Sequence, residues 1–341
     1  MNSNIGARTP TETLGPLLSD AQAEAMLDLC KHFGVYRQYA VETPSGHFCP
    51  ELLQRHDTAL NYLRTGGIAP ADEPVEIHGA RSSYFRAEYA YSADITMPGI
   101  EIFRDHTGLA DAARRIHGRP VVVPAIVYAN LMVPGQQLAV HTDVPEFRGA
   151  NRKELPEWLL VVMHHSGLFD QWRMPIVTAV SYFGDAPGGE FVFWPDGPSC
   201  PAETFAAGHN SAIVTDTDSV FHGVAPVDDP AASPPSVLGA GLRWDAGAWT
   251  LTDADETTRR LGVDEVRISV SWKAYCFTDE NERAAWETRS DDLSLEKILG
   301  MLLDDLRTRG MVDSRPESDT DLGLMLIDEY IGFPQTDKLA S

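Results

Sequence analysis

The stretch VRISVSWKAYCF, residues 266–277, alternates polar and apolar residues with the period of a β-strand. One face carries Arg267, Ser269, Ser271 and Lys273, while the opposite face is apolar. A file of polar residues on a buried strand is costly unless each of them finds a partner. The Arg267 guanidinium suits a carboxylate held by two hydrogen bonds, to which Ser269 adds a third. The alternative is an arginine at a strand end that pairs with a nearby Glu or Asp.

Further strand-like segments before this one predict a mainly antiparallel β core. They are rich in β-branched and aromatic residues, and Pro, Gly, Asn and Asp separate them. These segments are VVVPAIVYANLMV (121–133), LAVHTD (138–143), MPIVTAVSYF (174–183), GEFVFW (189–194) and SAIVTDTDSVFHGV (211–224). We expect a sandwich or barrel flanked by helices.

The segments on either side of this core are predicted to be helical or to be insertions. The predicted organisation is a polar tail over 1–18, a mostly helical part over 19–119, a catalytic β core over 120–278 with insertions at 144–173 and 226–264, and helices over 279–341. Helical periods cover 19–34, 50–67, 108–120 and 154–172, and LRWDAGAWTLT (242–252) reads as a hairpin within the second insertion. The apolar stripes of the C-terminal helices are expected to pack on the core or across a homodimer interface.

Composition limits the classes of partner and compartment. The chain has 27 Lys and Arg against 50 Asp and Glu, a net charge of −23, which repels nucleic acid and anionic lipid. Four scattered cysteines without a CxxC pair predict reduced thiols. The N-terminus lacks a signal-peptide pattern, and the apolar runs are too short to span a bilayer. We therefore expect a cytoplasmic protein that binds neither nucleic acid nor membranes.

The stretch QQLAVHTDVPEFRG (136–149) contains the first candidate for metal binding. A His-x-Asp pair is expected by chance roughly once in a chain with this many histidines, so its position matters. Residues i and i+2 of a strand share a face, so His141 and Asp143 can present their side chains to one point. His222, at the end of a later strand-like run, would complete two histidines and one carboxylate on one face of an iron(II) ion.

Four motifs in order resemble the iron(II)- and 2-oxoglutarate-dependent oxygenases, most closely the prolyl-hydroxylase-like branch. They are NLMVPGQQLAVHTD, VSYFGDAPGGEFVFW, AAGHNSAIVTDTDSVFHGVAPV and VRISVSW, within residues 120–278. The resemblance implies a double-stranded β-helix, a cupin-like jelly roll of two facing sheets. It implies that His141, Asp143 and His222 bind Fe(II), and that Arg267 and Ser269 bind the distal carboxylate of 2-oxoglutarate, with O2 as the second cosubstrate.

Two departures from the family pattern concern the cosubstrate. The family often has a tyrosine on the strand before the turn, where this chain has Met132, with Asn130 and Tyr128 on the same face as candidate replacements. His222 and Arg267 are 45 residues apart, further than in relatives. The 226–264 insertion explains this distance if it lies between the last two strands. If instead the final strand is misassigned, Arg267 is not the cosubstrate arginine, and Arg243 is the alternative.

The resemblance implies an oxygenase, most simply a hydroxylase of a small molecule such as an amino acid or specialised metabolite. Asp143 favours hydroxylation over halogenation, because related halogenases have a small residue there. Desaturation, cyclisation and epimerisation are alternative reactions that use the same ligands. A peptidyl prolyl-type substrate is an alternative to a small molecule. A third hypothesis is a non-enzymatic, metal-binding cupin-like protein. Arg148, Arg152 and Arg86 accompany aromatic residues and would suit a substrate carboxylate; otherwise they are solvated arginines that balance nearby Glu.

Overall fold

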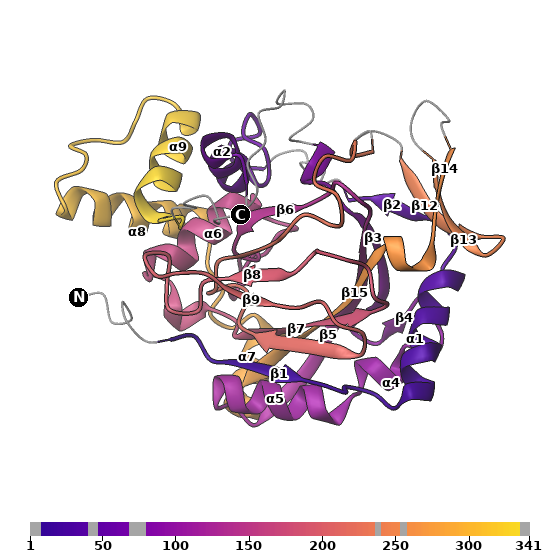
Figure 1. Cartoon of the computed structure of the whole chain (residues 1–341). Helices are drawn as coiled ribbons and strands as arrows, with labels where there is room; N and C mark the ends of the chain where they lie inside the picture. Colours follow the sequence, from indigo (N-terminus) through magenta and orange to yellow (C-terminus); the bar gives the residue numbers. More distant parts are fainter. Residues whose placement is uncertain (1–7, 40–46, 68–79, 236–239, 253–257, 335–341) are drawn as a thin grey trace.

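A computed structural model describes residues 8–39, 47–67, 80–235, 240–252 and 258–334, and these form two antiparallel sheets flanked by helices (Figure 1). The larger sheet has eleven strands. In spatial order they are β1 (Thr11–Leu14), β10 (Ser211–Thr215), β7 (Ile176–Phe183), β15 (Arg267–Phe277), β5 (Val121–Met132), β3 (Phe85–Tyr91), β2 (Tyr36–Gln38), β12 (Gly241–Asp245), β13 (Ala248–Thr252) and β14 (Thr258–Leu261), and β4 (Asp94–Ile95) pairs with β3.

The smaller sheet has four strands and packs against the middle of the larger one. Its order is β6 (Leu138–His141), β11 (His222–Val224), β8 (Phe191–Phe193) and β9 (Glu203–Phe205). Tyr182 of β7 shares a buried apolar cluster with Phe191 and Phe193 of β8. Met132 of β5 and Val224 of β11 belong to a second such cluster. These contacts hold the two sheets together, and the predicted site residues lie between the sheets.

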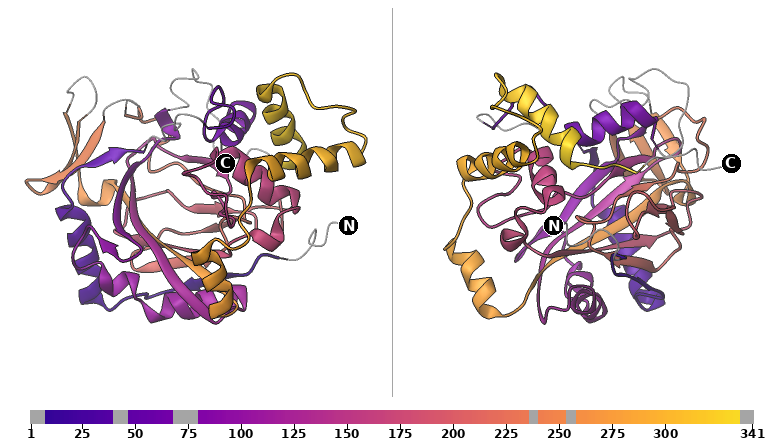
Figure 2. Two further views of the ribbon diagram at one scale, coloured as in Figure 1. Left: turned by 180° about the vertical axis from the view of Figure 1, so that it is seen from behind. Right: turned by 90° about the vertical axis from the view of Figure 1, so that its left-hand side faces the viewer.

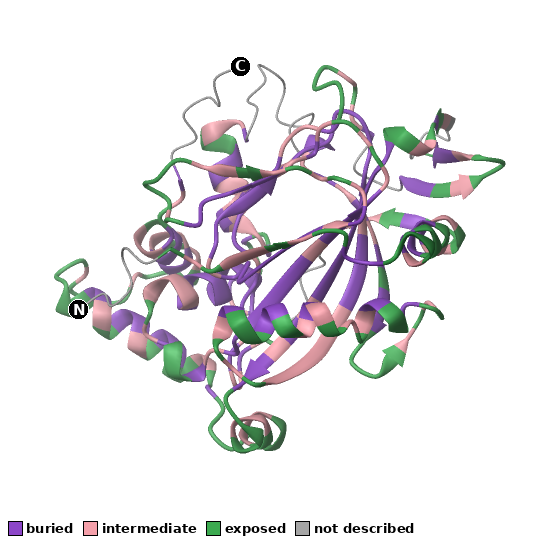
Figure 3. Ribbon diagram, turned by 60° about the horizontal axis from the view of Figure 1, so that its bottom comes forward, coloured by how far each residue is buried: buried purple, intermediate pink, exposed green. Residues whose placement is uncertain are grey.

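Helices cover the outer face of the larger sheet. They are α1 (Asp20–His32), α4 (Glu101–Arg104) and α5 (Thr107–His117). Trp272 of β15 is fully buried on this face and donates a 2.7 Å hydrogen bond from Nε1 to the Arg104 carbonyl. The apolar face of residues 266–277 therefore faces this helical layer, as its alternation predicts. In Figure 3 the buried residues (purple) concentrate on these strands, and the exposed ones (green) lie on the surrounding helices and loops.

A second apolar core lies beside the smaller sheet. It contains α2 (His56–Thr65), α6 (Glu157–Ser166), α8 (Leu295–Thr308) and α9 (Asp319–Tyr330), while α7 (Glu280–Thr288), η1 (Asp170–Trp172) and η2 (Val263–Glu265) are connecting helices. Leu302 of α8 and Leu326 of α9 are fully buried in the same apolar cluster as Trp158 of α6. Figure 2 shows α8 and α9 (yellow) together at one end of the molecule. Their apolar stripes are thus used within the chain, and a dimer contact would need other faces of these helices.

Two predictions for the N-terminal third are wrong in part. Residues 11–14 are not a polar tail but the edge strand β1, paired with β10. Residues 19–119 contain the predicted helices but also β2, β3 and β4, and β3 pairs with β5 inside the sheet. The hairpin within 242–252 is confirmed, because β12 and β13 pair antiparallel, and with β14 they extend the larger sheet from β2. Parts of the 226–264 insertion lie outside the described residues.

Among the helices in the described part of the chain, none combines the length and the apolar character needed to cross a bilayer.

Candidate metal and cosubstrate site

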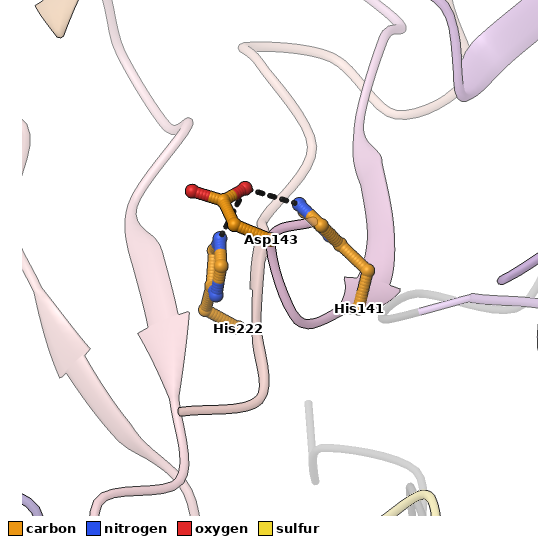
Figure 4. Close-up of side chains that lie close together, drawn as sticks. All are labelled: His141, Asp143 and His222. Carbon is orange, nitrogen blue, oxygen red and sulfur yellow. Dashed lines mark ion pairs between the residues drawn. The ribbon is translucent and has the colours of Figure 1, made fainter. Parts of the chain in front are cut away.

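The structure brings His141, Asp143 and His222 together between the two sheets (Figure 4). His141 ends β6 and pairs directly across the sheet with His222, the first residue of β11. Asp143 follows β6 by two residues, and its Oδ1 lies 3.6 Å from Nε2 of His141 and 3.8 Å from Nε2 of His222. One donor atom from each residue falls within 4.8 Å of the others. Antiparallel pairing of two short strands therefore creates the cluster.

Backbone carbonyls set the tautomer of both histidines. Nδ1 of His141 lies 2.8 Å from the Ala139 carbonyl, and Nδ1 of His222 lies 2.8 Å from the Val220 carbonyl. Because a carbonyl only accepts, each Nδ1 carries the proton, and each Nε2 keeps its lone pair for a ligand. Burial, with a smaller contribution from His141, lowers the pKa of His222 to about 3. His222 is therefore neutral at physiological pH, the form that binds metal.

Asp143 is held in place by two donors that use only one of its oxygens. Oδ2 accepts 2.6 Å hydrogen bonds from Nζ of Lys273 and from the Thr217 hydroxyl, which leaves Oδ1 facing the histidines. Burial alone would raise the pKa of Asp143, but Lys273 and the two histidines hold it well below its usual range. Lys273 belongs to the predicted polar face of β15, but strand alternation alone does not indicate that it contacts Asp143.

These three donors match one face of a metal site. Two neutral imidazole nitrogens and one carboxylate oxygen are the ligands that non-haem iron(II) takes in a facial triad, which leaves further positions open. Among the described residues, no other His, Cys, Asp or Glu joins this cluster. The donor set fits a divalent metal that keeps exchangeable positions, and it lacks the thiolates that favour a closed structural zinc site.

Arg267 lies on the same face of β15 as Lys273 and is buried without a carboxylate. Its Nε donates to the Gly189 carbonyl at 2.7 Å and its Nη1 to the Ser269 hydroxyl at 3.2 Å. Burial lowers the pKa of Arg267, and within the described ranges no carboxylate is at ion-pair distance from it. A buried guanidinium without a counter-charge is costly, so this arrangement is suited to an anionic ligand.

Two buried polar atoms beside Arg267 also lack partners. Ser269 pairs across the sheet with Asn130 of β5 on one side and with Tyr182 of β7 on the other. The Asn130 side-chain oxygen and the Tyr182 hydroxyl are both buried without a hydrogen-bond partner, and the Tyr182 ring lies 5.0 Å from the Arg267 guanidinium carbon. Asn130 is one of the predicted residues. Tyr182 was missed, although the alternation of IVTAVSYF places it on the same face as Thr178 and Val180.

The remaining candidates separate into different environments. Tyr128 lies under the guanidinium of Arg86, at 3.7 Å. Met132 contacts Arg267 directly through its sulfur at 3.8 Å. Arg243 is exposed on β12, away from the site residues of β15, so the alternative to Arg267 has no support. The 226–264 segment does lie between β11 and β15, as the long spacing required.

Arg148 does not face an open site. Its Nε and Nη2 pair with both oxygens of Asp291 at 2.7 and 2.9 Å, and it also donates to the Gln171 carbonyl. Its own carbonyl accepts from the Leu293 amide. These contacts attach the C-terminal segment to the core and occupy the guanidinium, so we leave Arg148 out of the substrate site.

No protein-family model matches the chain, and no curated protein matches it in sequence. Solved structures with a similar fold include a 2OG-Fe(II) oxygenase family oxidoreductase from Burkholderia pseudomallei. The match has 13% sequence identity and a TM-score of 0.40, and it covers 78% of this chain and 84% of the oxidoreductase. The match to the epimerase SnoN from nogalamycin biosynthesis has 12% identity and a TM-score of 0.40, and it covers 80% of this chain and 82% of SnoN. The match to a prolyl-4-hydroxylase from Pseudomonas putida has 15% identity and a TM-score of 0.32, and it covers 75% of this chain and 99% of the hydroxylase. At these values the function rests on the geometry of the site.

Proposed function

We propose that this chain is a non-haem iron(II)- and 2-oxoglutarate-dependent oxygenase built on a double-stranded β-helix, and that it hydroxylates a small molecule. One observation carries the proposal. His141, a neutral His222 and an ionised Asp143 lie between the same two sheets as the buried, carboxylate-free Arg267. A metal triad next to an unpaired buried guanidinium is the combination that a metal-chelating dicarboxylate needs.

Each residue has a separate task in this proposal. His141, His222 and Asp143 would hold Fe(II), which with 2-oxoglutarate and O2 supplies the oxidising power for an unactivated C–H bond. Lys273 and Thr217 hold the second oxygen of Asp143, so the carboxylate binds through one atom. Arg267 and Ser269 would bind the distal carboxylate of the cosubstrate, joined by the Tyr182 hydroxyl, whose O–H would then gain an acceptor. Asn130 could add a hydrogen bond only through its amide NH2 group, because its side-chain oxygen accepts.

Access to the proposed metal favours a small substrate over a peptide. His141 and His222 are 8% and 5% exposed and the Asp143 side chain is 21% exposed, so only a small part of the ligand set is open to a substrate. The carboxylate of Asp143 occupies the place that a halogenase would leave for a halide, which favours hydroxylation. Desaturation, cyclisation and epimerisation use the same ligands, and the product formed from the substrate distinguishes them.

The direct test is conversion of 2-oxoglutarate to succinate under air. We expect Fe(II)-dependent succinate formation, accelerated by a substrate found among amino acids and other small metabolites. His222→Ala should abolish it, whereas Arg243→Met, which removes an exposed arginine from β12, should leave it unchanged. The absence of succinate from the intact, iron-loaded protein with every compound tested would contradict the proposal.

We also propose a cytoplasmic location. All four cysteines are free thiols, and Cys30, Cys49 and Cys276 are buried. Free thiols are typical of a reducing compartment, which also keeps iron in the ferrous state.

A further inference from the structure

We propose that the substrate carries a carboxylate, and that Arg86 and Arg152 bind it beside the metal. This inference rests on the proposed function and adds the chemical class of the substrate. It assigns to these two arginines a role separate from that of Arg267, which holds the cosubstrate.

Arg86 is surrounded by aromatic rings and lacks an acidic partner. Its guanidinium carbon lies 3.7 Å from the ring centre of Tyr128 and 4.8 Å from that of Tyr39, and the Tyr39 ring stacks on Tyr84 at 5.3 Å. Over the part of the chain that the structure describes, no carboxylate is at ion-pair distance from Arg86. Aromatic faces stabilise the cation but accept none of its in-plane N–H groups. The Tyr84 hydroxyl is a neutral partner of the guanidinium, so the fork still lacks a counter-charge and the rest of its N–H groups can bind a planar carboxylate.

The position of Arg86 in the sheet connects it to the proposed active site. Arg86 pairs across the sheet with Asn130, which pairs in turn with Ser269. The neighbours of Arg86 in β3, Phe85 and Ala87, face the opposite side and are buried in the core under the helices. The guanidinium is thus on the inner face of the larger sheet, the face that also carries Arg267 and Lys273.

Arg152 brings a second positive charge to the same region. Its side chain is 44% exposed, and its Nη1 lies 3.8 Å from Glu157, a distance too long for a hydrogen bond. Although the partial burial of Arg152 lowers its pKa, the carboxylate of Glu157 and, to a smaller extent, that of Asp143 raise it, and Arg86 acts in the opposite direction.

Two repelling guanidinium groups are unusual in a chain of net charge −23. An anion between them would remove the repulsion, and a small carboxylate can be held by the fork of Arg86 and the more mobile Arg152. Asp143 and Glu157 repel the same anion at short range, so the carboxylate is expected on the Arg86 side. The oxidised carbon would then be a short distance from the carboxylate, toward Asp143.

The test compares acids with their amides. A panel of L-amino acids and small carboxylic acids, each with its carboxamide, is screened for stimulated succinate formation by the iron-loaded full chain. We expect at least one acid to stimulate turnover and its amide to have a KM higher by about 10- to 100-fold, the range for a lost charge-assisted contact. Arg86→Met should raise the KM of that acid to a similar extent and Arg86→Lys should restore part of it, with Arg243→Met as the matched control.

Binding of the cosubstrate separates this inference from the proposed function. Arg86→Met should leave the affinity for 2-oxoglutarate unchanged, because Arg267, the residue proposed to bind it, is intact. Loss of 2-oxoglutarate binding in Arg86→Met would assign Arg86 to the cosubstrate and overturn the inference. Equal KM values for acid and amide, or stimulation by neutral compounds alone, would overturn it as well. If the intact protein makes no succinate with any compound, the proposed function fails instead.

Discussion

Lys273 is a residue whose replacement would affect metal binding without removing a ligand. Its ammonium group donates a 2.6 Å hydrogen bond to Oδ2 of Asp143, and the carboxylate raises the pKa of Lys273 against the effect of burial. In Lys273→Met only the Thr217 hydroxyl would restrain Asp143. We expect metal affinity to fall about 10-fold or more, as for other residues that orient metal ligands. Competition with a chromophoric chelator measures this change, and Lys297→Met on α8 is the control. An unchanged affinity would show that Lys273 only fills space.

Gly189 shows why the turn before β8 needs two glycines. It has a φ of 68°, and a Cβ there would collide with Cδ of Arg267. A Cβ at Gly188, with a φ of 71°, would instead meet the Pro226 carbonyl. Both Gly→Ala variants should therefore lose stability, but only Gly189→Ala should displace the guanidinium.

We expect Gly189→Ala to weaken 2-oxoglutarate binding about 10-fold or more while metal affinity is kept, because one charged contact is worth this much. Isothermal titration of the metal-loaded variants with 2-oxoglutarate measures the difference. An equal effect in Gly188→Ala would mean that the turn acts on the site only through stability.

At the scale of residues, the metal ligands could be predicted from the sequence, but the side chains that contact the ligands and Arg267 could not. His141, Asp143 and His222 could be chosen because strand spacing and order along the chain restrict them, and the structure brings them together. Lys273 and Tyr182 could not be assigned, because their partners come from strands distant in sequence. Strand alternation indicates the face of a residue but not what lies opposite it.

Helix α6 contains a half-buried histidine, His165, that should make the protein sensitive to acid. The ring of His165 stacks on Phe221 at 5.1 Å, and burial lowers the pKa of His165 to about 4. The folded state binds the proton less readily than the unfolded state, whose pKa is about 6.5. Stability from this group is thus complete above pH 6.5 and is lost as the pH falls toward 4.

In His165→Phe this contribution to acid sensitivity should disappear. We expect the unfolding free energy of the parent to fall about 2 kcal/mol more than that of the variant between pH 6.5 and pH 4. Urea titrations at several pH values measure both slopes. His32→Gln, at the exposed end of α1, is the control and should keep the slope of the parent. Parallel slopes for parent and His165→Phe would contradict this account of α6.

At the scale of elements, the helices were easier to predict than the edges of the sheet. The helix α1 begins after Ser19, and α2 and α5 end at Gly66 and Gly118 in left-handed conformation, as the local signals indicate. The strand β3 was missed even though FRAEYAY alternates, because its partner β5 begins 30 residues after it ends, at Val121. The four residues of β1 give too short a pattern, and their pairing with β10 is a long-range effect.

For the whole molecule, metal binding should stabilise the fold because its ligands come from strands of one small sheet and the loop that follows β6. Ni(II), which resists oxidation, is a suitable probe. A ligand that binds only the folded state at 100 times its dissociation constant adds about 2.7 kcal/mol. We expect a melting temperature higher by several degrees with Ni(II), an increase that His141→Ala abolishes. The same increase in His141→Ala would place the metal elsewhere.

The order of strands in the larger sheet is the part of the fold that the sequence did not provide. An antiparallel β core with flanking helices could be predicted from the hydrophobic periodicity and from the Pro, Gly, Asn and Asp residues that separate the segments. The position of β3 and β2 between β5 and the strands β12–β14 could not, because it depends on long-range pairing such as that of Arg37 in β2 with Gly241 in β12, more than 200 residues later. The pairing of β3 with β5 places Arg86 on the inner face beside Asn130.

The central claim is that one site holds both the metal and 2-oxoglutarate. Anaerobic addition of Fe(II) and 2-oxoglutarate to the intact protein should produce a weak visible charge-transfer band. His141→Ala should abolish the band. In Arg267→Met the 2-oxoglutarate concentration that gives half of the maximum band intensity should be about 10- to 100-fold higher. No band in the intact protein, or a band indifferent to both substitutions, would contradict the account.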